Sequence, residues 1–168
     1  MRGSVKIPTL IVLMCVLEVP AFAERKDKPT GEEIANKAKA AKFDSANSTA
    51  GEKIGKKVKL TPAKLDHVKS EAELEGGQII GMLETEAPGD ETGLPPGKYN
   101  VFAAKVGNDW HVYAESGGKI VVEAVHVRVE KSNDRTPKKP EFHAEGWCSW
   151  WWLLPPWGLV TFVFTNCF

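Results

Sequence analysis

The chain has 168 residues, with 22 basic and 22 acidic side chains and therefore a formal net charge of zero at pH 7. This balance gives no electrostatic case for a nucleic-acid partner. The length is typical of a single domain, and a hydrophobic content of 42% is enough to build one core. The sequence contains neither a Gly-rich phosphate loop nor a nucleophile elbow, so it favours a binding protein over an enzyme.

Residues 1–23 have the features of a secretory signal peptide. A basic start is followed by an apolar run, 7–17, that is too short for a stable membrane anchor, and Ala21-Phe22-Ala23 has the small-x-small form of a cleavage site. A lipoprotein signal at Cys15 is disfavoured, because Met14 stands where a lipobox requires a small residue. We expect an exported protein, secreted or periplasmic, with a membrane-associated form as an alternative.

Segment 24–57 is low in hydrophobic residues and reads as a mobile basic arm. Thr30 and Glu33 have the spacing of a capping box, which predicts a short helix from Gly31 to Phe43. The apolar stripe of this helix is one isoleucine and two alanines. Because so little area can be buried, we expect the helix to be transient.

The strand signals in segment 58–131 predict a β-rich domain. Thr61-Pro62 is a helix start, and the apolar spacing that follows predicts a packing helix through Leu74. Strands are predicted at 79–83, 99–106, 110–115 and 120–130. The last of these is rich in β-branched residues with a period of two, which makes it the strongest strand signal in the chain.

Two glycine turns set a provisional register for these strands. A turn at Gly107-Asn108 pairs Phe102 with Tyr113, and a turn at Gly117-Gly118 pairs Tyr113 with Val122 and Trp110 with Val125. Apolar residues then lie on both faces of the sheet. We therefore expect the 61–74 helix to cover one face, and the C-terminal block or a partner chain to cover the other.

The same register brings Asp109, His111 and His126 to one face of the sheet. Two imidazoles and a carboxylate could hold a divalent transition metal. The alternative is that each histidine is an ordinary half-exposed strand residue. This face is also the site expected for a small secreted or periplasmic enzyme, the competing functional class.

Residues 132–145 read as a polar linker to a tryptophan-rich block, 146–168, that has no charged side chain and holds five of the six tryptophans. We predict a hairpin here with Trp157-Gly158 at its turn. The predicted pairs are Cys148 with Cys167, Trp150 with Thr165, Trp151 with Phe164, Trp152 with Val163 and Leu153 with Phe162. After removal of the leader these two cysteines are the only pair, so an exported chain should join them in a disulfide.

The aromatic hairpin has three open roles: part of the domain core, a contact with a membrane interface or partner protein, or a platform for a glycan. We favour the contact role slightly, because the linker separates the block from the meander. The candidate binding residues are Trp150, Trp151, Trp152, Trp157, Phe162 and Phe164.

The sequence thus predicts a β-rich α+β fold, with an antiparallel meander or sandwich-like sheet, one packing helix and a disulfide-closed aromatic hairpin. The function that follows is a non-catalytic binding or assembly protein of the cell envelope. We expect no cofactor and no nucleic acid. A homo-oligomer is compatible with the aromatic block.

Overall fold

The computed structural model describes residues 25–131, 139–145, 148–153 and 158–164. Its strands form two antiparallel sheets, which confirms the β-rich α+β class. The first sheet has the order β1-β2-β3-β4-β5-β6, with strands Thr49–Lys53, Lys56–Pro62, Gln78–Thr85, Gly97–Val106, Asp109–Ser116 and Lys119–Glu123. The second has the order β7-β10-β9-β8, with β7 His126–Lys131, β8 Glu141–Glu145, β9 Cys148–Leu153 and β10 Gly158–Val163.

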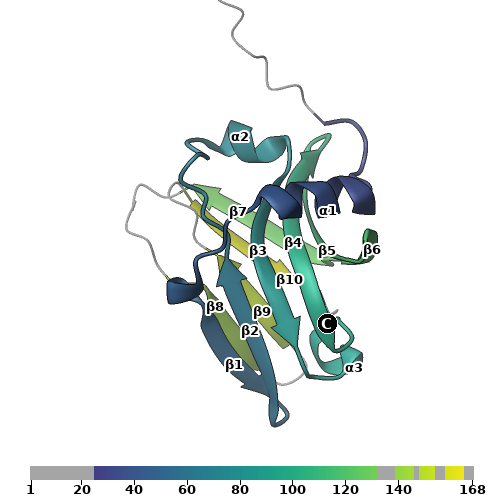
Figure 1. Ribbon diagram of the computed structural model, residues 1–168, viewed down its shortest axis with the longest axis vertical. Coiled ribbons are helices and arrows are strands. Elements are labelled where there is room, and N and C mark those ends of the chain that lie inside the picture. Colours follow the sequence, from purple (N-terminus) through teal and green to yellow (C-terminus); the bar gives the residue numbers. More distant parts are fainter. Residues whose placement is uncertain (1–24, 132–138, 146–147, 154–157, 165–168) are drawn as a thin grey trace, which may run out of the picture.

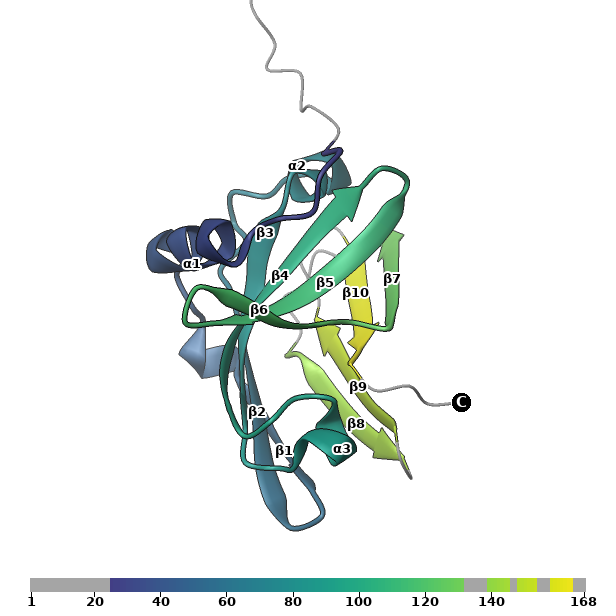
Figure 2. The same cartoon turned by 90° about the vertical axis from the view of Figure 1, so that its right-hand side faces the viewer.

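The two sheets lie face to face, and helix α1 (Gly31–Ala40) covers the outer face of the first sheet (Figures 1 and 2). The short elements are η1 (Ser45–Asn47), α2 (Glu71–Glu75) and α3 (Gly89–Thr92). One core cluster joins the layers, because Val160 and Phe162 of β10 belong to it together with residues of β2 to β5. Among the described residues, no helix has the length and apolarity needed to cross a bilayer.

Segment 25–57 is part of the fold, so the expectation of a mobile arm is corrected. The Thr30 hydroxyl accepts from the Glu33 amide at 3.1 Å, as the capping spacing predicts, but the helix ends at Ala40 rather than Phe43. Ile34 is 0% exposed against the sheet. The stripe is short, but a single fully buried isoleucine contributes on the order of 2 kcal/mol, which an isolated helix lacks.

The predicted helix at 61–74 is wrong. Strand β2 continues through Pro62, and only the short α2 is helical, beginning after the Ser70 cap, whose hydroxyl accepts from the Glu73 amide. Leu65 and Val68 are nevertheless buried, at 4% and 1% exposed. The apolar spacing therefore marked core residues correctly, but they reach the core from a non-helical segment.

The predicted register is confirmed between β4 and β5, where Phe102 faces Tyr113. Between β5 and β6 the predicted register holds next to the turn, where Glu115 faces Ile120. It is wrong on the other side of a bulge between Ala114 and Glu115, because Tyr113 faces Glu123 rather than Val122. The strand predicted at 120–130 is two strands in different sheets. The chain changes sheet at a corner: the Ala124 amide donates to Val112 of β5, and the next amide, of Val125, donates to Val163 of β10, both at 2.8 Å.

The linker predicted at 132–145 is also corrected in part. Residues 132–138 lie outside the described residues, but Glu141–Glu145 forms β8 and pairs with β9 along its length. The Thr49 hydroxyl donates to the carbonyl of Pro140, which joins the entry of β8 to β1. The tryptophan strand β9 is thus an inner strand of the second sheet, with β8 on one side and β10 on the other.

Candidate functional site

The tryptophan-rich block supplies the two inner strands of the second sheet. Strands β9 and β10 are antiparallel, but their register differs by two residues from the predicted one: Phe162 faces Trp151, and Val163 faces Trp150. The predicted pairs of Trp151 with Phe164 and of Trp152 with Val163 are therefore wrong. A shift of two leaves every residue on the same face, so the alternation of the sequence does not distinguish the two registers.

The predicted disulfide is neither formed nor excluded by the described residues. Cys148 faces Glu145 of β8, whereas Cys167 lies outside the described residues. Trp157 of the predicted Trp157-Gly158 turn is likewise outside the described residues. The new register removes the strand-pairing argument for the disulfide. The argument from an oxidising compartment still applies.

Two of the candidate binding residues are core residues. Phe162 is 0% exposed and Phe164 is 3% exposed, and their rings meet edge to face with centroids 5.6 Å apart. Phe162 lies in a cross-strand row with Val127 and Phe142, which both pack against the core cluster. Trp151 occupies the remaining position of this row. The row therefore faces the first sheet.

The rows on either side of it belong to the outer face of the second sheet, because successive residues of a strand point to opposite faces. Sequence positions 150 and 152 stand in these outer rows. One row contains Arg128, Thr161, Trp152 and Glu141, and the other contains His126, Val163, Trp150 and His143. Arg128, His126 and Glu141 are exposed. The outer face thus combines two tryptophan positions with the exposed side chains of Arg128, His126 and Glu141. Val163, between His126 and position 150, is 1% exposed.

The candidate metal ligands are not brought together. Asp109 faces Val106 within the first sheet, while His126 faces Val163 in the second. His111 is engaged elsewhere: its Nδ1 lies 2.6 Å from Glu123 Oε1. Across the part of the chain that the structure describes, no group of three or more His, Cys, Asp or Glu side chains is arranged to hold a metal ion. The facing of Asp109 and His126 depended on the register that the bulge and the corner change.

A cluster of titratable groups surrounds His111 instead. Glu123 also accepts from Lys28 Nζ at 2.7 Å. Burial alone would raise the pKa of Glu123, but the hydrogen bonds from Lys28 and His111 lower it below its ordinary value. Tyr113 stacks on the His111 ring with centroids 6.0 Å apart, and burial, with a smaller effect of the Glu123 charge, raises its pKa to about 12. This cluster fastens the segment before α1 to β5 and β6.

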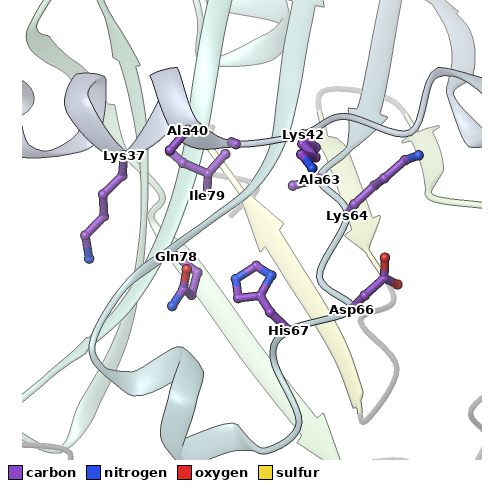
Figure 3. Close-up of a pocket in the computed structure, with 10 residues that line it drawn as sticks. Lys37, Ala40, Lys42, Ala63, Lys64, Asp66, His67, Gln78 and Ile79 are labelled. Carbon is purple, nitrogen blue, oxygen red and sulfur yellow. The ribbon is translucent and has the colours of Figure 1, made fainter.

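A cavity of about 480 Å³ opens on the outer face of the first sheet, between the end of α1, segment 63–67 and the start of β3 (Figure 3). Ala63 and Ile79 form an apolar floor, at 9% and 4% exposed. Polar and charged side chains surround this floor: Lys37, Lys42, Lys64, Asp66, His67 and Gln78. Sequence reasoning missed this site, because α1 and segment 63–67 meet only through the tertiary fold.

The sequence indicated the exposure of one residue that lines this cavity. His67 was expected to be a surface residue, and it is exposed. Lys42 and Lys64 are distant in the sequence, and the bridge between Phe43 and Ala63 makes them neighbours.

Comparisons of the chain with protein-family models, with curated proteins and with solved structures find no match.

Proposed function

We propose that this protein is exported and acts without catalysis, as a binding or assembly protein of the cell envelope. Its contact surface is the outer face of the second sheet, where Trp150 and Trp152 meet a membrane surface or a partner protein. This proposal replaces a separable aromatic hairpin with a face of the folded sandwich. Phe162 and Phe164 no longer count among the contacting residues.

The observation that carries the proposal is the cross-strand row through Arg128, Thr161, Trp152 and Glu141. Tryptophan and arginine are enriched at protein interfaces, and tryptophan also favours the headgroup level of membranes. A tryptophan position between an exposed Arg128 and an exposed Glu141 has the aromatic centre and charged rim that contact surfaces share.

Export is supported by the apolar leader and by the contacts of the residues that follow the expected cleavage site. Cleavage after Ala23 leaves a single residue before Arg25, whose carbonyl already accepts from the Gly107 amide at 2.9 Å. Removal of the leader therefore preserves every contact described from Arg25 onward. Terminal sequencing of the exported protein should begin at Glu24, whereas Met1 or a lipidated Cys15 at the terminus would contradict the export proposal.

The contact surface is tested with the double variant Trp150→Ser/Trp152→Ser. The matched control is Ile54→Ser, because Ile54 is 59% exposed and lies on the β1–β2 turn of the first sheet. Purified proteins are floated with vesicles of phosphatidylcholine alone and with added phosphatidylglycerol. Burying one tryptophan contributes roughly 1.5 to 3 kcal/mol, so the double variant should lose about tenfold or more in affinity. The control should float like the wild type.

Failure of the wild type to float assigns the surface to a protein partner, which is then sought by crosslinking in intact cells with the same two variants. Light scattering detects a second copy of the chain as that partner. If the double variant is retained in the envelope fraction as well as the wild type, and its folding is unchanged, the outer face of the second sheet is not the contact surface.

A further inference from the structure

The cavity at the end of α1 lies on the opposite side of the sandwich from the proposed contact surface (Figures 1 and 2). Its volume, about 480 Å³, falls within the range of about 300 to 1,000 Å³ of small-molecule sites. Such sites combine an apolar lining with a few polar groups that fix the orientation of the ligand. Ala63 and Ile79 supply the apolar part here, and basic side chains supply the polar part.

Two lysines are held directly opposite each other at the edge of this cavity. Phe43 and Ala63 form an antiparallel bridge, and the next pair outward is Lys42 with Lys64, whose main chains are joined by a Lys64 amide to Lys42 carbonyl bond of 2.7 Å. Like charges directly opposite each other on paired strands are destabilising. Both side chains are exposed, so two flexible basic side chains start from paired main-chain positions at the cavity edge. Figure 3 shows the Lys64 side chain extending away from His67 and Ile79.

Nearby carboxylates offset this charge only in part. Asp66 is exposed at the rim. Asp44 is engaged by Asn47, whose side-chain amide donates to it at 2.7 Å; this bond is the main reason that the pKa of Asp44 is lowered, and Lys64 adds a smaller effect. Lys37 is committed elsewhere, because its Nζ donates to the Gly77 carbonyl at 2.8 Å and lies 3.6 Å from Glu33.

The remaining polar groups complete an anion-binding arrangement. Figure 3 shows the imidazole of His67 projecting toward the interior of the cavity, beside Gln78. The Gln78 amide nitrogen donates to the Glu73 carbonyl at 3.4 Å, and its oxygen is an acceptor only. The donors within reach of a ligand are therefore the imidazole and the two lysine side chains, of which the flexible Lys64 side chain has to turn toward the cavity. The C-terminal end of α1 at Ala40 also lines the cavity, and its partial negative charge favours the nearby Lys42 ammonium and opposes an anion placed against the helix end.

We propose that this cavity binds a small organic anion with an apolar body, such as an aromatic carboxylate. The apolar body lies on Ala63 and Ile79, and the carboxylate accepts charge-assisted hydrogen bonds from Lys42 and Lys64, with His67 as a third donor. The inference is independent of the proposed envelope contact, because none of these residues belongs to the second sheet.

The probes are 2-naphthoate and its neutral analogue 2-naphthamide, which share one apolar body and differ in charge. Calorimetric titration of the mature protein should show naphthoate binding about tenfold more tightly than naphthamide. The double variant Lys42→Gln/Lys64→Gln should lower the naphthoate affinity to near that of naphthamide. The matched control is Lys57→Gln/Lys59→Gln, the same change of charge on exposed lysines of β2, and it should bind like the wild type.

A second variant tests the apolar part of the site. Ala40 is exposed at the last position of α1 and lines the cavity, so Ala40→Trp should fill the space without disturbing the core. It should abolish binding of both probes while the unfolding midpoint stays unchanged. Equal affinity for the two probes, unchanged naphthoate binding by the Lys42/Lys64 variant, or no binding of naphthoate at millimolar concentration would each overturn the proposal.

Discussion

His111 Nδ1 lies 2.6 Å from Glu123 Oε1, and the other oxygen of the same carboxylate accepts from Lys28 Nζ at 2.7 Å. A single carboxylate therefore joins β5, β6 and the segment that precedes α1. Because β6 is the last strand of the first sheet before the chain crosses to the second, this contact holds the edge from which the crossing starts.

Replacing Glu123 with Gln should reduce the free energy of unfolding by about 1 kcal/mol at pH 7. The pKa of Glu123 is lowered in the folded state, so its stabilisation is present above its unfolded value, near 4.5, and is lost as the pH falls through the lower folded value. Urea unfolding at pH 7 and at pH 3 measures both effects. Glu130→Gln is the control, because Glu130 pairs with its exposed neighbour Arg128. Equal effects of the two variants would contradict a special role for Glu123.

Tyr113→Phe should stabilise the protein. The side chain is 1% exposed, and among the described residues its hydroxyl has no hydrogen-bond partner. Removing an unsatisfied buried hydroxyl should gain about 1 kcal/mol, while stacking on His111 is retained. Tyr99→Phe is the matched control with the opposite sign, because the Tyr99 hydroxyl donates to the Pro95 carbonyl at 2.6 Å. Denaturant unfolding of both variants at pH 8 decides the prediction.

The same tyrosine should make the fold sensitive to alkali. The pKa of Tyr113 is about 12 in the folded state against an ordinary value of 10.0, so the unfolded chain loses the phenol proton first. The free energy of unfolding is therefore unaffected by this group below pH 10 and falls as the pH rises from 10 to 12. Stability measured between pH 9 and pH 11.5 should therefore fall more steeply for the wild type than for Tyr113→Phe. Parallel curves would show that Tyr113 is exposed to solvent.

Ile34→Ala should destabilise the protein by roughly 2 to 4 kcal/mol, because this fully buried side chain is the main anchor of α1 on the sheet. Ile54→Ala makes the same change on a side chain that is 59% exposed, and should cost less than about 0.5 kcal/mol. Limited proteolysis at the lysines of α1 gives an independent readout. If the wild type is cleaved as fast as Ile34→Ala, segment 24–57 is a mobile arm, as its composition predicts.

Phe162→Ala should cost about 3 to 5 kcal/mol, and deletion of 145–168 should leave no cooperative unfolding transition. The reason is that β10 contributes Val160, Phe162 and Phe164 to the shared core. Near-ultraviolet circular dichroism and thermal unfolding measure both variants. A truncated chain that melts cooperatively would show that the first sheet folds alone and that the second is an accessory layer.

The disulfide between Cys148 and Cys167 stays a prediction. Closing a loop of this length should stabilise the folded state by roughly 3 kcal/mol. Intact-mass measurement with alkylation, before and after reduction, should reveal two thiols only after reduction. Two free thiols in freshly isolated protein, or a covalent dimer, would reject the intramolecular bond.

Local interactions explain what could be predicted from the sequence alone. The Thr30 cap and the Gly107-Asn108 turn act between residues that are close in the sequence, so they predict the start of α1 and the pairing of Phe102 with Tyr113. Burial of Leu65 and Val68 was also predictable, because apolar side chains leave water in whichever backbone conformation presents them. The β-rich class follows from the many β-branched runs.

The tertiary structure decided where the strands are placed. The core-facing residues of 120–130 change phase at the corner, from Ile120, Val122 and Ala124 before it to Val127 and Val129 after it. Ala124 bonds to one sheet and Val125 to the other, and a period of two is the same in either sheet. The register of β9 against β10 is ambiguous for the same reason, since a shift of two residues preserves both faces. The meeting of Lys42 with Lys64 depends on a bridge between distant segments. Local sequence indicated the burial of Leu65 and Val68 but not that of Ile34 or Phe162, because these two side chains are buried by strands distant in the sequence. The choice of partner strand likewise depends on contacts that no short stretch of sequence contains.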